Sequence, residues 1–87
     1  MYQVVAERKV EKHLRALPPD VFEAVVAAIR ALANDPRPPN CRKLRGTEQG
    51  WRIVVRKDYR VLYTVDDAAR EVRVFRVARR GKATYRR

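Results

Sequence analysis

The first part of the chain carries apolar residues at helical spacing. A short β-branched run at residues 2–5 predicts a strand. From Glu7 to Leu17 the apolar positions recur every three to four residues, which predicts an amphipathic helix whose inner face holds Val10, Leu14 and Leu17. Pro18 and Pro19 end this helix, because proline disfavours helical geometry in the residue before it.

A second helix is predicted directly after the prolines. Asp20 is expected to cap it, with Glu23 three residues further on, and the segment 34–36 is expected to close it. The predicted inward stripe consists of Phe22, Val25, Ile29 and Leu32. Because only a few residues join the two helices, we expect them to be antiparallel.

After Gly50 the pattern changes to alternation, which is typical of strands. In segment 51–56, Trp51, Ile53 and Val55 point one way, and Arg52, Val54 and Arg56 the other. A tight turn at Lys57-Asp58 leads to a second strand, in which Tyr59, Val61, Tyr63 and Val65 alternate with Arg60, Leu62 and Thr64. Residues 66–70 form another turn, and a third strand, 71–77, has Val72 and Val74 on one face and Phe75 and Val77 on the other.

These elements predict an α+β fold. An N-terminal strand and an antiparallel helical hairpin pack on a small, mainly antiparallel four-stranded sheet, and residues 36–50 are a connection. Trp51 is expected to seal the interface between helices and sheet, and Tyr59 and Tyr63 to enter the core. A chain of 87 residues has room for one modest core, so we expect residues 1–87 to form a single domain with a surface groove instead of a deep active site.

Charge is distributed very unevenly along the chain. Residues 1–35 hold five basic and five acidic side chains, so the whole net charge of +11 belongs to residues 36–87. Such an asymmetry favours a polyanionic partner, of which nucleic acid is the most common. The alternative is that the charge only keeps the protein soluble.

Other classes of site receive little support. Cys41 is the only cysteine, which excludes an internal disulfide, and with His13 as the only histidine it also argues against a Cys/His zinc site. We expect Cys41 to be a partly buried thiol and His13 to be solvated. With no signal peptide pattern and no apolar run of membrane-spanning length, we expect a cytoplasmic protein that needs no metal or cofactor.

The open face of the predicted sheet gathers arginines. Arg52 and Arg56 share a strand face, Arg60 lies across the turn, and the last strand leads to Arg79, Arg80 and Tyr85 at the same end of the sheet. Guanidinium groups bind phosphate oxygens bidentately and stabilise the charge of a phosphoryl transition state, while tyrosine can stack on an unpaired base. In RNA cleavage the substrate supplies its own 2′-hydroxyl nucleophile. Alternatively, Arg52, Arg56 and Arg73 only solvate the open face of the sheet, and Arg60 pairs with Asp58 or Glu71.

Four features together resemble the RelE toxins of the RelE/ParE superfamily of bacterial toxin–antitoxin modules, over nearly the full length. They are the helical hairpin, the segment Lys43-Leu44-Arg45-Gly46, the hairpin ending in residues 58–63, and Arg79-Arg80 followed by Tyr85. The resemblance implies a ribosome-dependent, metal-independent mRNA endonuclease. It assigns Arg60 and Arg80 to the scissile phosphate, Tyr85 to mRNA positioning, and Arg52 to a place where the family often has lysine. We expect these four residues to be catalytic. Further RNA contacts are expected from Lys43, Arg45, Arg56, Lys57, Arg79 and Lys82.

The sequence also departs from that pattern. Val54 stands where better-studied RelE toxins carry a second strand lysine, and arginine is a poor general base at neutral pH. Tyr85, Lys57 or Lys82 can fill that role, and the sequence does not choose among them. Two other functions stay open: a ParE-like inhibitor of DNA gyrase acting by protein contact, and an RNA-binding module without nuclease activity.

The resemblance also implies partners. These are a cognate antitoxin, mRNA in the A site of the 70S ribosome, and promoter DNA bound through the antitoxin; no membrane is involved. Apolar helix surface offers a dock for an amphipathic antitoxin helix. An acidic antitoxin segment is expected to lie across Arg60 and Arg80 or to distort their approach.

Overall fold

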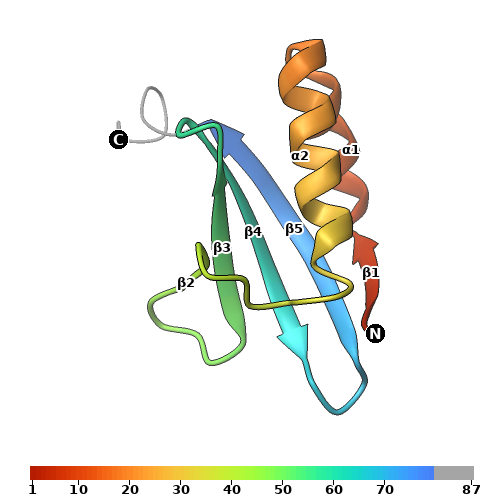
Figure 1. Cartoon of the computed structure of the whole chain (residues 1–87), viewed down its shortest axis with the longest axis vertical. Coiled ribbons are helices and arrows are strands. Elements are labelled where there is room, and N and C mark those ends of the chain that lie inside the picture. Colours follow the sequence, from red (N-terminus) through yellow and green to blue (C-terminus); the bar gives the residue numbers. More distant parts are fainter. Residues whose placement is uncertain (80–87) are drawn as a thin grey trace.

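A computed structural model describes residues 1–79. Their elements are β1 (Gln3–Ala6), α1 (Arg8–Arg15), α2 (Pro19–Ala31), β2 (Arg42–Lys43), β3 (Gly50–Val55), β4 (Tyr59–Asp66) and β5 (Glu71–Arg79). The strands form one sheet in the order β1-β5-β4-β3-β2, and the two antiparallel helices lie on one side of it (Figure 1). The predicted α+β class is confirmed.

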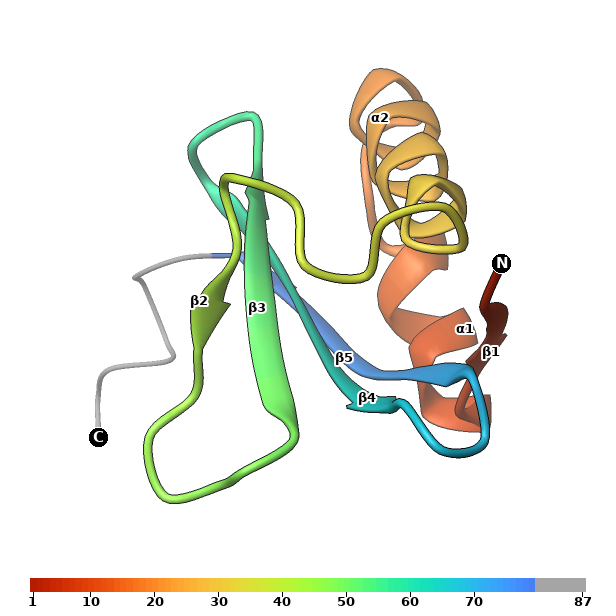
Figure 2. The same cartoon turned by 60° about the horizontal axis from the view of Figure 1, so that its bottom comes forward.

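The sheet is mixed, and it is one strand wider than the alternating pattern indicates. β1 pairs with β5 in parallel, and the other neighbours are antiparallel. The additional strand is β2, which runs beside β3 within the segment expected to be only a connection (Figure 2). Two residues are too short to give an alternating pattern, so only their pairing partner reveals them as a strand.

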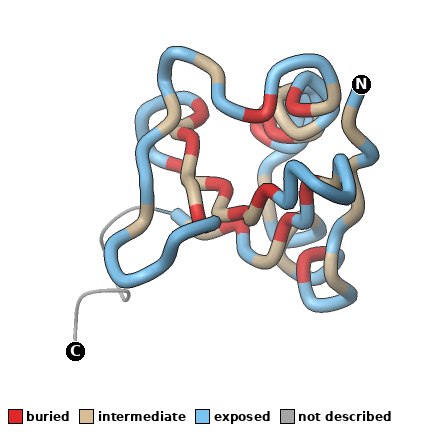
Figure 3. The backbone as a smooth tube through the Cα atoms, turned by 90° about the horizontal axis from the view of Figure 1, so that it is seen from below, coloured by how far each residue is buried: buried red, intermediate tan, exposed pale blue. Residues whose placement is uncertain are grey.

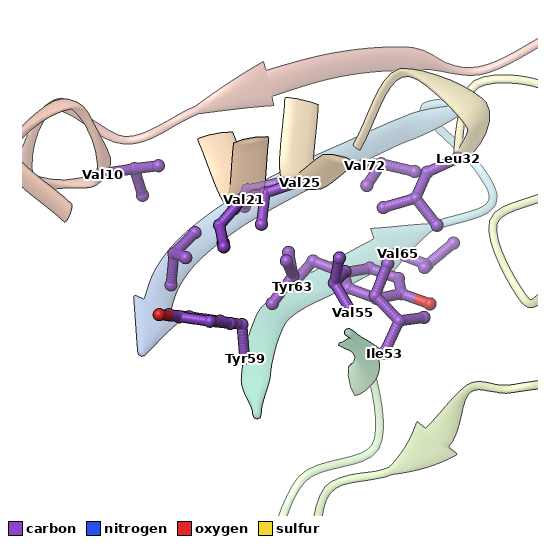
Figure 4. Packing of buried hydrophobic residues seen from close by; sticks show 13 residues of the cluster. Val10, Val21, Val25, Leu32, Ile53, Val55, Tyr59, Tyr63, Val65 and Val72 are labelled. Atoms are coloured by element: carbon purple, nitrogen blue, oxygen red, sulfur yellow. The ribbon is translucent and has the colours of Figure 1, made fainter. Parts of the chain in front are cut away.

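The core lies between the helices and the facing side of the sheet. Val10, Val25 and Leu32 on the helical side pack over Tyr63, Val72 and other strand residues (Figure 4). In Figure 3 the buried positions concentrate where strands and helices face each other, and the connecting loops are mostly exposed. The predicted alternation in β4 is confirmed, because Tyr59, Val61, Tyr63 and Val65 are all buried.

Helix α2 differs from the prediction in two ways. Pro19 takes its first position and Pro18 its N-cap, with no side-chain cap hydrogen bond, so the prediction of Asp20 as the cap is wrong. Proline suits that position because its fixed φ is helical and its missing N–H would have no partner there. With the helix starting at Pro19, Val21 points inward and is 7% exposed. Phe22 is 41% exposed, so it does not belong to the inner stripe.

A β-bulge changes the faces of β5. The pairing moves from Leu62 with Arg76 to Tyr63 with Val74, so Phe75 is the extra residue. An inserted residue reverses the alternation beyond it. Val77 is therefore buried in the core, 5% exposed, and not on the opposite face as predicted, and Arg79 follows it onto the helix side.

Candidate nucleic-acid interface

The face of the sheet away from the helices carries a cluster of four arginines, which we call the arginine patch: Arg42, Arg52, Arg60 and Arg76. Three of them belong to one row across the sheet, because Arg42 pairs with Arg52, Arg52 with Leu62, and Leu62 with Arg76. Strand alternation places Arg52 opposite in direction to buried Ile53, and Arg76 opposite to buried Val77. The row thus crosses four strands on the open face.

Arg60 lies near the start of β4, two residues before Leu62 on the same face. Its paired neighbours are Val54 on β3 and Ala78 on β5. Its Nε is buried, and among the described residues this atom has no hydrogen-bond partner. A buried donor without a partner is uncommon and costs free energy, so it points to a ligand or to a functional requirement.

This end of the sheet carries more basic than acidic side chains, although Asp58 is exposed in the turn before β4 and Asp20 pairs with Arg56. Arg42 and Arg52 are paired directly across β2 and β3, so two like charges lie opposite each other in the sheet. The acidic pair Asp66 and Glu71 lies at the other end of β4 and β5, about 20 Å from Arg60 at 3.3 Å per residue. Guanidinium groups are hydrogen-bond donors only, so the patch can hold an anion but offers no general base.

Arg56 and Arg79, both predicted to lie on the open face of the sheet, lie elsewhere. Arg56 lies in the turn between β3 and β4, where Arg56 and Lys57 adopt φ values of 55° and 67°. From there it reaches toward α2, and its Nη1 pairs with Asp20 at 3.1 Å. The prediction that Arg56 shares a strand face with Arg52 is therefore wrong. A left-handed backbone conformation is rare at residues other than glycine. Because this turn contains no glycine, the sequence did not indicate that Arg56 would adopt it.

Arg79 occupies the same end of the sheet as Arg60 but the opposite face. Its guanidinium carbon lies 5.9 Å from the ring centroid of Tyr59, on the helix side. The expectation that one surface gathers both arginines fails here because of the bulge at Phe75.

The remaining predicted RNA contacts are spread over loops and termini. Lys43 on β2 donates from Nζ to the carbonyl of Glu48 at 2.7 Å and lies 5.5 Å from the centroid of the Trp51 ring. Arg45 and Lys57 are exposed in loops. Trp51 packs against the edge of the core, with Arg37 also 5.5 Å from its ring centroid. Arg80, Lys82 and Tyr85 lie outside the described residues.

Sequence reasoning misses Arg42 and Arg76. Arg42 falls in a predicted connection, and only its pairing with Arg52 brings it to the patch. A better signal exists for Arg76, since it follows Arg52 and Arg60 as a basic residue flanked by apolar strand positions. Their inclusion makes the patch wider than predicted.

His13 is not simply solvated, contrary to the prediction. Its Nδ1 accepts a hydrogen bond from the backbone N–H of Val77 at 3.1 Å. Burial, followed by the charges of Arg76 and Lys9, lowers the pKa of the imidazole. The charge of Arg76 reaches the ring, but the ring is on the helix side of the sheet, opposite the face that carries Arg60, so it is not placed to supply the missing base there.

Comparison with known proteins assigns the chain to a family. A family model described as the ParE toxin of the type II toxin–antitoxin system parDE matches residues 4–84. The chain belongs to this family. It is a type II toxin of the RelE/ParE superfamily, and its fold is RelE-like.

Solved structures of RelE toxins are similar to this toxin over most of their length. The isolated Escherichia coli RelE toxin is 26% identical with a TM-score of 0.80, and the match covers 94% of this chain and 87% of that one. The toxin of the archaeal RelE–RelB complex from Pyrococcus horikoshii is 28% identical with a TM-score of 0.78, and the match covers 93% of this chain and 97% of that one. In the RelBE2 toxin–antitoxin complex from Mycobacterium tuberculosis, the matching chain is 30% identical with a TM-score of 0.78. The match covers 91% of this chain and 98% of that one.

A search of curated proteins found no match to this toxin. Within residues 1–79 no helix has the length and apolar character needed to cross a membrane. The same residues contain no group of three or more His, Cys, Asp or Glu arranged to hold a metal ion. Cys41 is a partly buried free thiol, as predicted.

Proposed function

We propose that this toxin is a cytoplasmic mRNA endonuclease that cleaves in the A site of the 70S ribosome without a metal, and that residues 1–87 act as a single toxin domain. In this proposal the arginine patch holds the RNA backbone. Arg60 and Arg52 contact the scissile phosphate, and Arg80 and Tyr85, which lie outside the described residues, complete the site on the strength of the RelE resemblance. Lys43, Arg45 and Lys57 extend the contacts along the strand.

The observation that carries the proposal is the environment of Arg60. Within residues 1–79 the Arg60 Nε is buried and has no hydrogen-bond partner, so a phosphate oxygen that reaches this donor displaces no hydrogen bond to these residues. Such preorganised donors contribute most where negative charge develops during the reaction. Removing one donor of this kind typically lowers a rate about 10²- to 10³-fold.

The groups that accept and donate protons during cleavage must lie outside the arginine patch. The 2′-hydroxyl of the RNA attacks the adjacent phosphorus and loses its proton, and the 5′-oxygen leaves with a proton. Lys57, in the exposed turn between β3 and β4 and three residues before Arg60, is one candidate for exchanging these protons. Lys82 and Tyr85 are the other candidates, and ribosomal RNA can order the substrate so that a weak base is sufficient.

A cognate antitoxin is the expected partner. Two of the similar structures are toxin–antitoxin complexes, RelE–RelB and RelBE2. We expect an acidic antitoxin segment to lie across Arg60 and Arg80 or to distort their approach, and the complex to bind its promoter through the antitoxin. An antitoxin that leaves the whole arginine patch exposed would refute this masking.

The test is primer extension on a reporter mRNA in a translating extract, with and without ribosomes. We expect wild-type toxin to cleave within codons only when ribosomes are present, and Arg60→Ala to lose at least 100-fold in rate. Arg73→Ala is the matched control, because Arg73 is exposed on β5 and already pairs with Glu71 at 3.3 Å. RNA binding without cleavage would leave only an RNA-binding module.

Gyrase inhibition is the second candidate, because the matching family model is named for the ParE toxin and Val54 removes a strand lysine. A toxin of that kind would arrest cells and poison gyrase in a supercoiling assay while leaving mRNA intact. Toxicity that survives in an Arg60→Ala, Arg52→Ala double variant would favour this alternative over the nuclease.

A further inference from the structure

A second basic site lies on the helix side of the same strand ends. It is a cavity of about 440 Å³, within the range typical of small-ligand sites. Lys12 and His13 of α1 and Arg79 of β5 supply positive charge or hydrogen-bond donors, and Leu17, Tyr59 and Val77 contribute to an apolar wall. No acidic side chain is among the described residues that line it.

The hydrogen bond of His13 determines which of its ring nitrogens can donate to a ligand in this cavity. β1 pairs with β5 only as far as Val74, so the backbone edge of β5 has no strand beside it further on. His13 Nδ1 takes the place of a strand carbonyl by accepting from the Val77 N–H. In the neutral ring the other nitrogen, Nε2, then carries the hydrogen and is a donor.

The cavity and the arginine patch are close along the backbone. Tyr59, in the cavity wall, directly precedes Arg60, and Arg79 directly follows Ala78, which pairs with Arg60. The two sites are therefore one residue apart along β4, roughly 3.3 Å, on opposite faces of the same strand end. A flexible strand that passes around this end of the sheet can contact both.

We propose that the cavity is a subsite for one nucleotide of single-stranded RNA, with the base against the Tyr59, Leu17 and Val77 wall and the phosphate between Lys12 and Arg79. The inference rests on the proposed nuclease function and identifies where a neighbouring nucleotide would be read. Charge complementarity supports RNA as the occupant, because cationic side chains surround an apolar pocket as a base and its phosphate require.

The test uses the full-length toxin and a short RNA made uncleavable by 2′-O-methylation, with binding followed by fluorescence anisotropy at several salt concentrations. Lys12→Ala should weaken binding about 3- to 10-fold and reduce the salt slope by about 0.7, the value for one lost phosphate contact on a single strand. Arg8→Ala is the charge-matched control, because Arg8 is exposed on the same helix but outside this cavity. It should change binding less than about twofold, with the slope unchanged.

An NMR titration supplies an independent readout. Saturating RNA should shift the His13 ring resonances and the Val77 amide, and Lys12→Ala should reduce these shifts while Arg8→Ala leaves them unchanged. The two variants are compared because Arg76 on the open face also acts on His13. Equal effects of the two substitutions, or unmoved His13 resonances, would overturn the subsite. A shift caused by an acidic peptide, and not by RNA, would overturn it as well, since the cavity would then belong to a protein partner.

The two proposals can fail separately. If Arg60→Ala abolishes ribosome-dependent cleavage while Lys12→Ala binds RNA as wild type, only the subsite is wrong. If Arg60→Ala leaves an intact activity while Lys12→Ala still weakens RNA binding and His13 responds, the subsite stands and the proposed catalytic role of the patch is wrong.

Discussion

Replacing Arg60 with methionine should make the toxin more stable while it removes the proposed activity. Methionine keeps an unbranched apolar stem of similar reach, so the packing beside Val54 and Ala78 is largely retained. The change deletes the buried Nε that has no hydrogen-bond partner among the described residues. It also removes one positive charge from a patch that already holds Arg42, Arg52 and Arg76.

The size of the effect follows from the unpartnered donor. A buried, unsatisfied N–H costs about 1–3 kcal/mol, and the low end applies because the rest of the Arg60 side chain is only partly buried. We therefore expect the free energy of unfolding to rise by about 1 kcal/mol. In a chain of this length, that corresponds to an increase of roughly 4–8 °C in the melting temperature.

Thermal and urea unfolding of wild type, Arg60→Met and Arg76→Met measure this directly. Arg76 is exposed on the same face, so its substitution should change the free energy of unfolding by less than about 0.5 kcal/mol. A destabilised Arg60→Met variant would refute the reasoning, because it would mean that Arg60 is held by favourable interactions in the fold. A gain in stability together with lost cleavage would instead identify strain retained for function.

Three further predictions concern single contacts. Tyr63→Phe should lower the free energy of unfolding by about 1–2 kcal/mol, because the buried hydroxyl donates to the carbonyl of Pro36 at 2.7 Å; an unchanged urea midpoint would contradict this. The His13 pKa is lowered in the fold, so as pH drops below about 6.5 the unfolded chain takes up a proton before the folded one and the free energy of unfolding should fall. His13→Asn should remove this decrease from melting temperatures measured at pH 5–8. The same pH dependence in wild type and variant would contradict the prediction. Asp20→Ala should cost less than about 0.5 kcal/mol in urea unfolding, since its ion pair is exposed; a loss near 1 kcal/mol would restore it as a helix cap.

The parts of the fold that follow local patterns were predictable. Strict alternation placed Tyr63 in the core, and helical spacing placed Val10 and Val25 there. Each of these positions depends on residues only a few steps away in sequence. The family resemblance then supplied the order in which such elements assemble.

The errors arose where one backbone detail redirects a side chain. A single extra residue, Phe75, sends Arg79 to the helix side, and the positive φ of Arg56 turns it toward Asp20. Neither detail changes the composition or periodicity enough to be visible in advance. Arg42 was missed for a different reason, since it joins the arginine patch only through pairing with Arg52.

The strand order has a consequence for when the toxin can act. β5 is the last described element in sequence, yet it lies between β1 and β4 in the sheet, and Gln3 pairs with Glu71. A nascent chain therefore cannot close its core, or present Arg76 and Ala78 beside Arg60, until β5 has left the ribosome. The complete sheet can therefore form only after nearly all of the described residues have been synthesised.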